Sequence, residues 1–171
     1  MPPLINVIVV MGVSGAGKTT VGHALAQRLG FEYVEGDDYH PRANVEKMRQ
    51  GIPLDDEDRA PWLAALASAI DGWIAADRKV VLSCSALKRD YRARLIRRAD
   101  RIRLVYLRGD RSRIAGRVEA RRGHFMPADL LDSQLATLEP PAEDERPIAV
   151  TVDGSPGEIA ERVVAELRGN K

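Results

Sequence analysis

A glycine-rich segment that ends in a lysine and a threonine is the part of this sequence best suited to chemistry. The pattern G-x-x-x-x-G-K-T is complete from Gly12 to Thr19. Its glycines let backbone N–H groups approach and surround a phosphate, which the positive end of a following helix also attracts. Lys18 would reach the β- and γ-phosphates of a nucleotide, and the hydroxyl of Thr19 would bind Mg²⁺. The pattern therefore predicts a P-loop for a nucleoside triphosphate.

The flanks of this segment agree with that prediction. An apolar run, Ile5–Val10, precedes it, and a helical pattern with Val21, Leu25 and Leu29 on one face follows it. Strand, glycine-rich turn and helix form the context that a P-loop requires, whereas a purely structural turn is the alternative. The expected nucleotide-binding residues are Gly12, Val13, Ser14, Gly15, Ala16, Gly17, Lys18, Thr19 and Thr20.

Two carboxylates, Glu35 and Asp37, lie at the end of the second predicted strand, Phe31–Glu35. They are two residues apart, so they would share one face if the strand continued. An acid that organises Mg²⁺ and a base for an acceptor hydroxyl would both be useful there, because phosphoryl transfer needs mainly positioning and charge stabilisation. The alternative is a turn in which acidic side chains cap backbone N–H groups.

Arginines are concentrated between Arg108 and His124. Arg117 and Arg121 are four residues apart and would share a helix face, from which they could close over ATP. Gly123 could serve as the hinge of such a lid, for which we expect the range 110–139. A solvated basic face is the alternative.

The elements that must position these residues alternate between strand and helix. Predicted strands cover 5–11, 31–35, 79–85, 102–107 and 148–152, with helices over 18–29, 41–50, 59–77, 88–98, 110–122 and 127–138 and from 156. This order predicts an α/β fold with a doubly wound, five-stranded parallel sheet. Because ligands bind outside the carboxyl ends of such strands, the P-loop, the turn 35–40 and the segment 83–88 should meet at one crevice.

Composition limits the class of protein. The chain has 171 residues, which fits one domain, 1–171. Its net charge of +1 does not give the strong positive electrostatic potential that would attract nucleic acid. A single cysteine, Cys84, excludes an internal disulfide and fits a reducing compartment. The first apolar run is too short to span a bilayer, so we expect a cytoplasmic protein.

Beyond the P-loop, the sequence resembles the gluconokinase family, small P-loop sugar-acid kinases related to shikimate and adenylate kinases. The resemblance covers nearly the whole chain. The matching motifs lie in Met11–Thr19, Gly36–Met48, Gly51–Leu63, Cys84–Arg92 and Gly123–Phe125. Two of these motifs are specific to this family: the acidic middle block, Gly51–Leu63, and the C-S-A-L-K block from Cys84 to Lys88.

The resemblance implies ATP-dependent phosphorylation of D-gluconate at its 6-hydroxyl. Asp37 would be the base for that hydroxyl, Lys18 and Arg121 would act on the phosphates, and Arg117 would complete the lid pair. The family often has Asp where this chain has Glu35, so that residue would bind Mg²⁺ through water with a longer side chain. The residues implied in binding the anionic polyol are Asp37, His40, Lys47, Arg59 and Lys88. Members of the family often form dimers, so a homodimer is an expectation.

Two other functions remain open at this stage. A kinase for another small hydroxy acid, such as shikimate, would share the fold, and only the middle block disfavours it. A nucleotide-dependent switch protein would need a guanine-specific motif such as N-K-x-D, which the sequence lacks.

Overall fold

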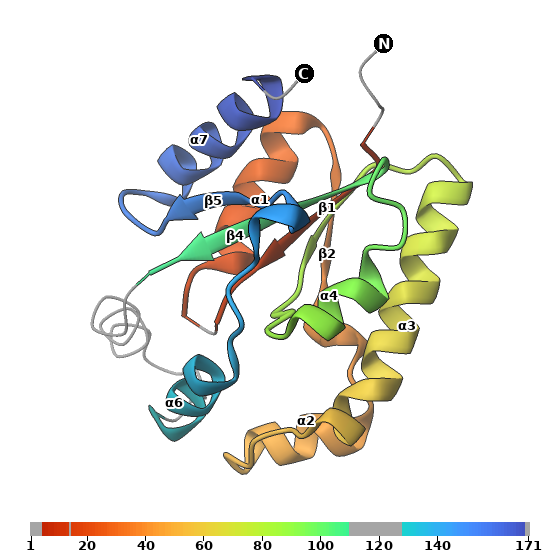
Figure 1. The fold of residues 1–171 in the computed structure, drawn as a ribbon, viewed down its shortest axis with the longest axis vertical. Helices are drawn as coiled ribbons and strands as arrows, with labels where there is room; N and C mark the ends of the chain where they lie inside the picture. The colour runs from red at the N-terminus through yellow and green to blue at the C-terminus, as the bar shows by residue number, and fades with distance from the viewer. Residues whose placement is uncertain (1–4, 14, 110–127, 170–171) are drawn as a thin grey trace.

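Five parallel strands form the centre of the molecule, in the order β2-β3-β1-β4-β5 (Figure 1). The computed structural model describes residues 5–13, 15–109 and 128–169. The strands are β1 (Val7–Met11), β2 (Glu32–Glu35), β3 (Val80–Ser83), β4 (Ile102–Arg108) and β5 (Ile148–Thr151). All four strand pairings are parallel, which confirms the predicted fold class.

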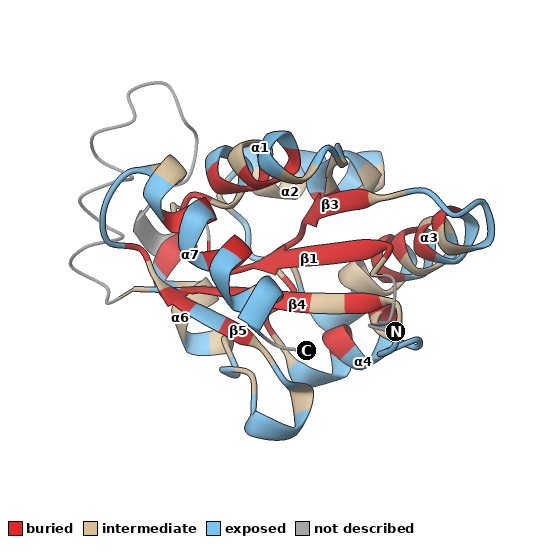
Figure 2. Ribbon diagram, turned by 90° about the horizontal axis from the view of Figure 1, so that it is seen from above, coloured by how far each residue is buried: buried red, intermediate tan, exposed pale blue. Residues whose placement is uncertain are grey.

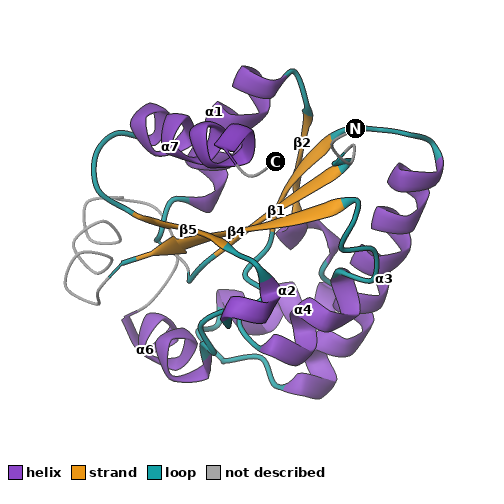
Figure 3. Ribbon diagram, turned by 45° about the horizontal axis from the view of Figure 1, so that its top comes forward, coloured by secondary structure: helices purple, strands orange, loops and turns teal. Residues whose placement is uncertain are grey.

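Helices cover both faces of this sheet (Figure 3). α1 (Lys18–Leu29) and α7 (Pro156–Gly169) lie on one face, and α3 (Asp56–Ala75) and α4 (Arg89–Leu95) lie on the other. The remaining helices are the 3-10 turns η1 (Gly36–Tyr39) and η2 (Glu143–Glu145), with α2 (Arg42–Arg49) and α6 (Ala128–Thr137).

The core consists of two apolar layers, one on each side of the sheet. Every residue of β1 is buried, as Figure 2 shows for the central strands, because helices cover both of its faces. Trp62 and Trp73 of α3 belong to one layer, as does Cys84, and burial raises the pKa of the Cys84 thiol to about 12. This thiol is therefore protonated and inert at neutral pH.

The register of the strand pairs places the carboxyl ends of β1, β2 and β3 next to one another. Ser83 at the end of β3 lies opposite both Val10 of β1 and Glu35 of β2. The segments that leave these ends therefore start side by side, although they are far apart in the sequence.

One local prediction was wrong, and the condition attached to a second was not met. The acid-rich segment 52–58, between the predicted helices 41–50 and 59–77, was expected to be a loop. However, α3 already begins at Asp56, because Asp55 and Asp58 form a capping box around its first turn. Glu35 and Asp37 do not share a strand face, because β2 ends at Glu35 and the chain turns into η1 at Gly36.

The predicted helix 110–122 lies outside the described residues, as does the expected hinge at Gly123. The single domain with a lid over 110–139 stays a prediction. Within the described part of the chain, no helix is long and apolar enough to cross a membrane.

Candidate active site

The P-loop leaves β1 and turns into α1 through Gly17. Gly17 has a φ of 95°, in the left-handed region where a Cβ is unfavourable, and it is the N-cap of α1. Lys18 is the first residue of the helix, and its Nζ donates a hydrogen bond of 3.1 Å to the carbonyl oxygen of Val13. The lysine is thus folded over the loop that is expected to bind phosphates. Ser14 lies outside the described residues.

A cavity of about 70 Å³ opens beside Lys18. It combines residues from the P-loop, η1, the loops after α2 and β3, and α6, so the predicted convergence at the carboxyl ends of the strands is confirmed. The lining residues are Lys18, Asp37, His40, Met48, Ile52, Pro53, Leu54, Arg59, Trp62, Ser85, Leu87, Ser133 and Gln134.

Asp37 and Lys18 supply opposite charges to this cavity. Water reaches 61% of the Asp37 side chain, yet the surrounding protein hinders its hydration enough to raise the pKa of the carboxyl. The positive charge of Lys18 opposes that increase. The raised pKa makes the Asp37 carboxylate a better proton acceptor than a fully hydrated aspartate.

Gly36 brings this carboxylate close to β3. A Cβ added to Gly36 would lie 2.4 Å from the carbonyl oxygen of Ser83, which is closer than real Cβ atoms approach. The absence of a side chain at Gly36 therefore allows η1 to pack directly on the end of β3, and it sets the position of Asp37.

Thr19 and Glu35 line an open groove together with Tyr33 and Asp38. The hydroxyl of Thr19 donates a hydrogen bond of 2.8 Å to Oε2 of Glu35, and the hydroxyl of Tyr33 donates one of 2.7 Å to the same oxygen. Ser83 lies 2.9 Å from the Tyr33 hydroxyl and donates to the backbone carbonyl of Lys18. Hydroxyl and carboxylate oxygens are the ligands that Mg²⁺ prefers, so this pair fits the expected metal position.

The imidazole of His40 lies inside the cavity, with 4% of its side chain accessible to water. It stacks on Trp62 at a centroid distance of 4.2 Å and an angle of 14°. Burial, with a contribution from the charge of Arg59, lowers the pKa of His40 to about 4. The ring is therefore neutral at physiological pH.

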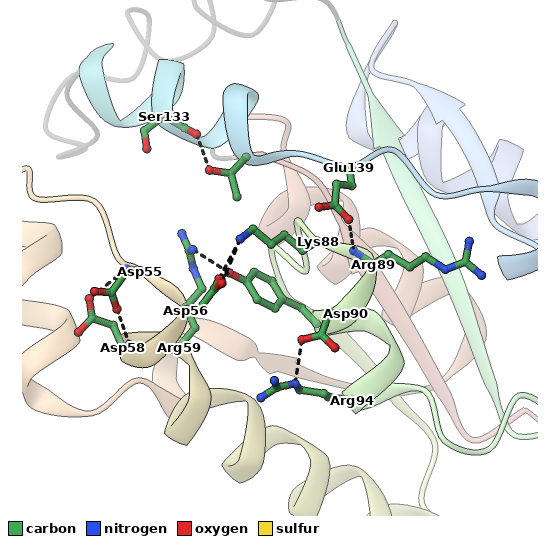
Figure 4. Close-up of polar contacts among 12 residues, drawn as sticks. Asp55, Asp56, Asp58, Arg59, Lys88, Arg89, Asp90, Arg94, Ser133 and Glu139 are labelled. Carbon is green, nitrogen blue, oxygen red and sulfur yellow. Dashed lines mark hydrogen bonds and ion pairs between the residues drawn. The ribbon is translucent and has the colours of Figure 1, made fainter.

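The other predicted substrate-binding cations are distributed differently. Arg59 lines the cavity, and its Nη1 donates a hydrogen bond of 3.1 Å to the hydroxyl of Tyr91. Lys88 instead pairs with Asp56 at 3.0 Å, next to Arg59, as Figure 4 shows. Neither Lys88 nor Lys47, which pairs with Asp58 at 2.9 Å, lines the cavity.

Sequence reasoning missed several residues of this site. Trp62 is both buried in the core and part of the cavity wall. Ser133 and Gln134 of α6 line the cavity within the range expected for the lid, whereas Arg117 and Arg121 lie outside the described residues. The serine and glutamine carry no motif, so only tertiary packing identifies them.

A larger cavity, of about 220 Å³, lies between α4 and η2. Arg89, Arg92 and Arg146 contribute to its wall, but none of the described residues of the P-loop does. Size is therefore a poor guide here, because the smaller cavity is the one lined by the predicted site residues Lys18, Asp37, His40 and Arg59. Among the described residues, no three His, Cys, Asp or Glu side chains gather as a metal site.

Known proteins resemble this chain over most of its length. The family described as "AAA domain" matches residues 7–141. The gluconokinase of Gluconobacter oxydans (strain 621H) is 50% identical over 163 residues, which cover 94% of this chain and 90% of that protein. The crystal structure of a gluconokinase from Sinorhizobium meliloti 1021 has a TM-score of 0.85 and 46% identity, covering 98% of this chain and 93% of that one.

A more distant likeness concerns the fold alone. Shikimate kinase from Aquifex aeolicus has a TM-score of 0.59 at 16% identity and covers 96% of this chain and 97% of that one. The chain is 46–50% identical to the two gluconokinases but only 16% identical to this shikimate kinase, so its sequence groups with the gluconokinases. The chain therefore belongs to the gluconokinase family, among the P-loop kinases.

Proposed function

We propose that this protein transfers the γ-phosphoryl group of ATP to the 6-hydroxyl of D-gluconate. The observation that carries the proposal is that Lys18 of the P-loop and Asp37 line one cavity. A phosphate held at the P-loop and a hydroxyl held at Asp37 would then be neighbours, which is the main requirement of phosphoryl transfer.

Each residue has a separate task in this reaction. P-loop N–H groups and Lys18 hold the phosphates and offset the negative charge of the transition state. Thr19 and Glu35 would hold Mg²⁺, which would neutralise charge on the β- and γ-phosphates. Asp37 accepts the proton of the attacking hydroxyl, and Arg117 and Arg121 would close over the nucleotide.

The substrate is a carboxylate with several hydroxyl groups, and the cavity offers matching partners. Arg59 supplies a cation, and His40, Ser85 and Gln134 supply groups that form hydrogen bonds. Lys47 and Lys88 could join only after leaving Asp58 and Asp56. We therefore propose Arg59 as the main partner of the gluconate carboxylate.

A coupled assay of ADP release tests the proposal. Gluconate should support turnover, while shikimate, glycerate and AMP should not, and Lys18→Ala should abolish turnover without lowering the melting temperature. Turnover with shikimate and not with gluconate would contradict the substrate assignment. Activity retained in Lys18→Ala would contradict the role of the P-loop.

The proposal extends to the assembly and the setting of the enzyme. We infer a homodimer that works in the cytoplasm, where ATP is available and Cys84 stays reduced. Light scattering of the purified protein tests the dimer, and a mass equal to one chain of 18.8 kDa would contradict it.

A further inference from the structure

Asn44 is a buried residue of α2 whose side-chain amide has two close partners. Only 3% of the residue is exposed. Its Nδ2 atom lies 2.7 Å from the backbone carbonyl oxygen of Asp58 and 3.1 Å from Nδ1 of His40. A carbonyl oxygen can only accept a hydrogen bond, so the Asn44 atom that faces Asp58 must be the NH₂ group and not the amide oxygen.

This orientation determines which nitrogen of His40 carries the hydrogen. Asn44 uses one N–H for Asp58 and has its second N–H available for Nδ1 of His40. Nδ1 therefore accepts a hydrogen bond and has no hydrogen of its own. Since the ring is neutral, its hydrogen must be on Nε2.

Nε2 of His40 is directed toward Asp37. The distance from Nε2 to Oδ1 of Asp37 is 3.8 Å, too long for a direct hydrogen bond. Both residues line the cavity beside Lys18. A hydroxyl oxygen bound near both could accept a hydrogen bond from Nε2–H and donate its own hydrogen to the Asp37 carboxylate.

The surroundings of His40 preserve this arrangement. Trp62 stacks on one face of the ring, and the Trp62 indole N–H is itself fixed by a 2.8 Å hydrogen bond to the carbonyl oxygen of Gly36. The charged groups that face the ring are Asp37 of η1 and Arg59 of α3. The stacking limits rotation of the imidazole, so the hydrogen on Nε2 has a defined direction.

We propose that Asn44 is a positioning residue that fixes His40 as the Nε2–H tautomer, so that His40 donates a hydrogen bond to the acceptor hydroxyl while Asp37 alone takes its proton. The substrate part of this inference rests on the proposed function. Asn44 occupies the lone pair of Nδ1, so His40 has no free basic nitrogen and serves as a donor. The pair therefore favours an acceptor substrate with a hydroxyl at this position.

The tautomer can be measured without any substrate. Protein labelled with ¹⁵N-histidine has three histidine signals, and His40→Gln identifies the signal of His40 by its loss. At pH 7 the ligand-free protein should show a protonated Nε2 and an unprotonated Nδ1 for His40. A protonated Nδ1, or a rapidly exchanging mixture of tautomers, would overturn the inference.

Asn44→Asp provides a second measurement on the same signal. A carboxylate at position 44 accepts hydrogen bonds, so the hydrogen of His40 should move to Nδ1 or the ring should become cationic. His23 lies in α1 with its ring centroid 3.7 Å from that of Tyr33, and the described contacts of Asn44 are with His40 and Asp58, so the His23 signal should not change. An unchanged His40 signal in a folded Asn44→Asp protein would show that residue 44 does not set the tautomer.

Kinetics test the role toward the substrate. His40→Gln keeps an N–H donor near the position of Nε2, whereas His40→Leu has none, so Gln should retain about tenfold more kcat/KM for gluconate. The KM for ATP should be alike in both. Equal losses in the two variants would overturn the donor role. If the wild-type protein does not phosphorylate gluconate, the proposed function fails and the substrate role with it, while the spectrum still decides the tautomer.

Discussion

Thr19 at the start of α1 and Glu35 at the end of β2 are joined by a hydrogen bond of 2.8 Å between Oγ1 and Oε2. This bond connects the P-loop helix to the adjacent strand end at the expected Mg²⁺ position. The third strand, β3, ends in Ser83 and not in an acidic residue. Glu35 therefore provides the carboxylate for this region from a different strand.

We predict that Glu35→Gln raises the Mg²⁺ concentration needed for half-maximal turnover, by about tenfold or more, because groups that orient a metal ligand have effects of that size. Titration of the kinase assay with Mg²⁺ measures this change. Asp38→Asn is a matched control, since Asp38 lines the same open groove and makes no hydrogen bond to Thr19 among the contacts described. An equal change in both variants would mean that Glu35 contributes only its negative charge and has no specific role through Thr19.

Asp37→Asn should lower kcat strongly while changing ATP affinity little, because the amide cannot accept the hydroxyl proton. In the wild-type enzyme, kcat/KM should fall as the pH falls through the pKa of Asp37, since only the carboxylate acts as a base. Burial raises that pKa, so the loss should begin at a higher pH than for a fully hydrated aspartate. A pH profile of kcat/KM for gluconate measures this, and unchanged turnover would remove Asp37 from the mechanism.

The same substitution should make the free protein more stable. A carboxyl whose pKa is raised by folding stabilises the fold while it is protonated, and this contribution is lost as the pH rises through the folded-state pKa. Above its folded-state pKa, Asp37 is held in its less favourable charged form, and a neutral Asn relieves it. The melting temperature of Asp37→Asn should exceed that of the wild type at pH 7, and the difference should shrink under acidic conditions.

Arg92 of α4 is a buried cation on which a neighbouring loop depends. Only 1% of it is exposed, and it pairs with Glu145 of η2 at 2.6 Å. Its Nη1 also donates to the carbonyl oxygens of Ala86 and Leu87, in the loop that continues from Ser85 at the cavity.

Arg92→Leu should therefore destabilise the protein by about 3–5 kcal/mol, because it leaves the Glu145 carboxylate without its partner. Arg89→Leu is the matched control: its pair with Asp144 is exposed, so its loss should have little effect. Urea unfolding of both variants measures the difference. Similar free energies of unfolding for the two variants would contradict the prediction that the buried Arg92–Glu145 pair matters more than the exposed Arg89–Asp144 pair.

Gly36 and Gly72 provide a comparison between a crowded and an open glycine. An alanine at Gly36 would collide with the carbonyl of Ser83, and we expect a loss of about 1–3 kcal/mol together with reduced turnover. Nothing lies within 4 Å of the Cβ position at Gly72 in α3, so Gly72→Ala should stabilise the protein by about 1 kcal/mol. Thermal unfolding and the kinase assay measure both effects. A Gly36→Ala enzyme with normal stability and turnover would refute the close packing of η1.

The sequence allowed the fold to be predicted well because its signals are local. Apolar runs and glycine positions marked the five strands, and the rule for parallel sheets placed Lys18 and Asp37 at one edge. The strand order was not predicted, since it depends on which helix packs on which face. The early start of α3 could have been recognised from Asp55 and Asp58, because both ends of a capping box are visible in the sequence.

The parts of the site that were not predicted depend on partners distant in sequence. Lys88 was expected at the substrate, but its proximity to Asp56 depends on how α3 packs beside α4. The buried amide of Asn44 was visible only as a motif residue, and its bond to Asp58 requires α2 to lie against α3. Residue types suggest chemistry, whereas the packing of helices decides which groups remain available for it.

The stacking of Trp62 on His40 also gives the molecule a natural optical reporter. The chain has two tryptophans, and the other, Trp73, lies eleven residues further along α3, about 16 Å away by helical rise. A compound entering the cavity would alter the surroundings of the first indole and leave the second nearly unchanged. Intrinsic fluorescence, with Trp73→Phe to remove the constant background, would then follow occupancy of the cavity directly and without a label.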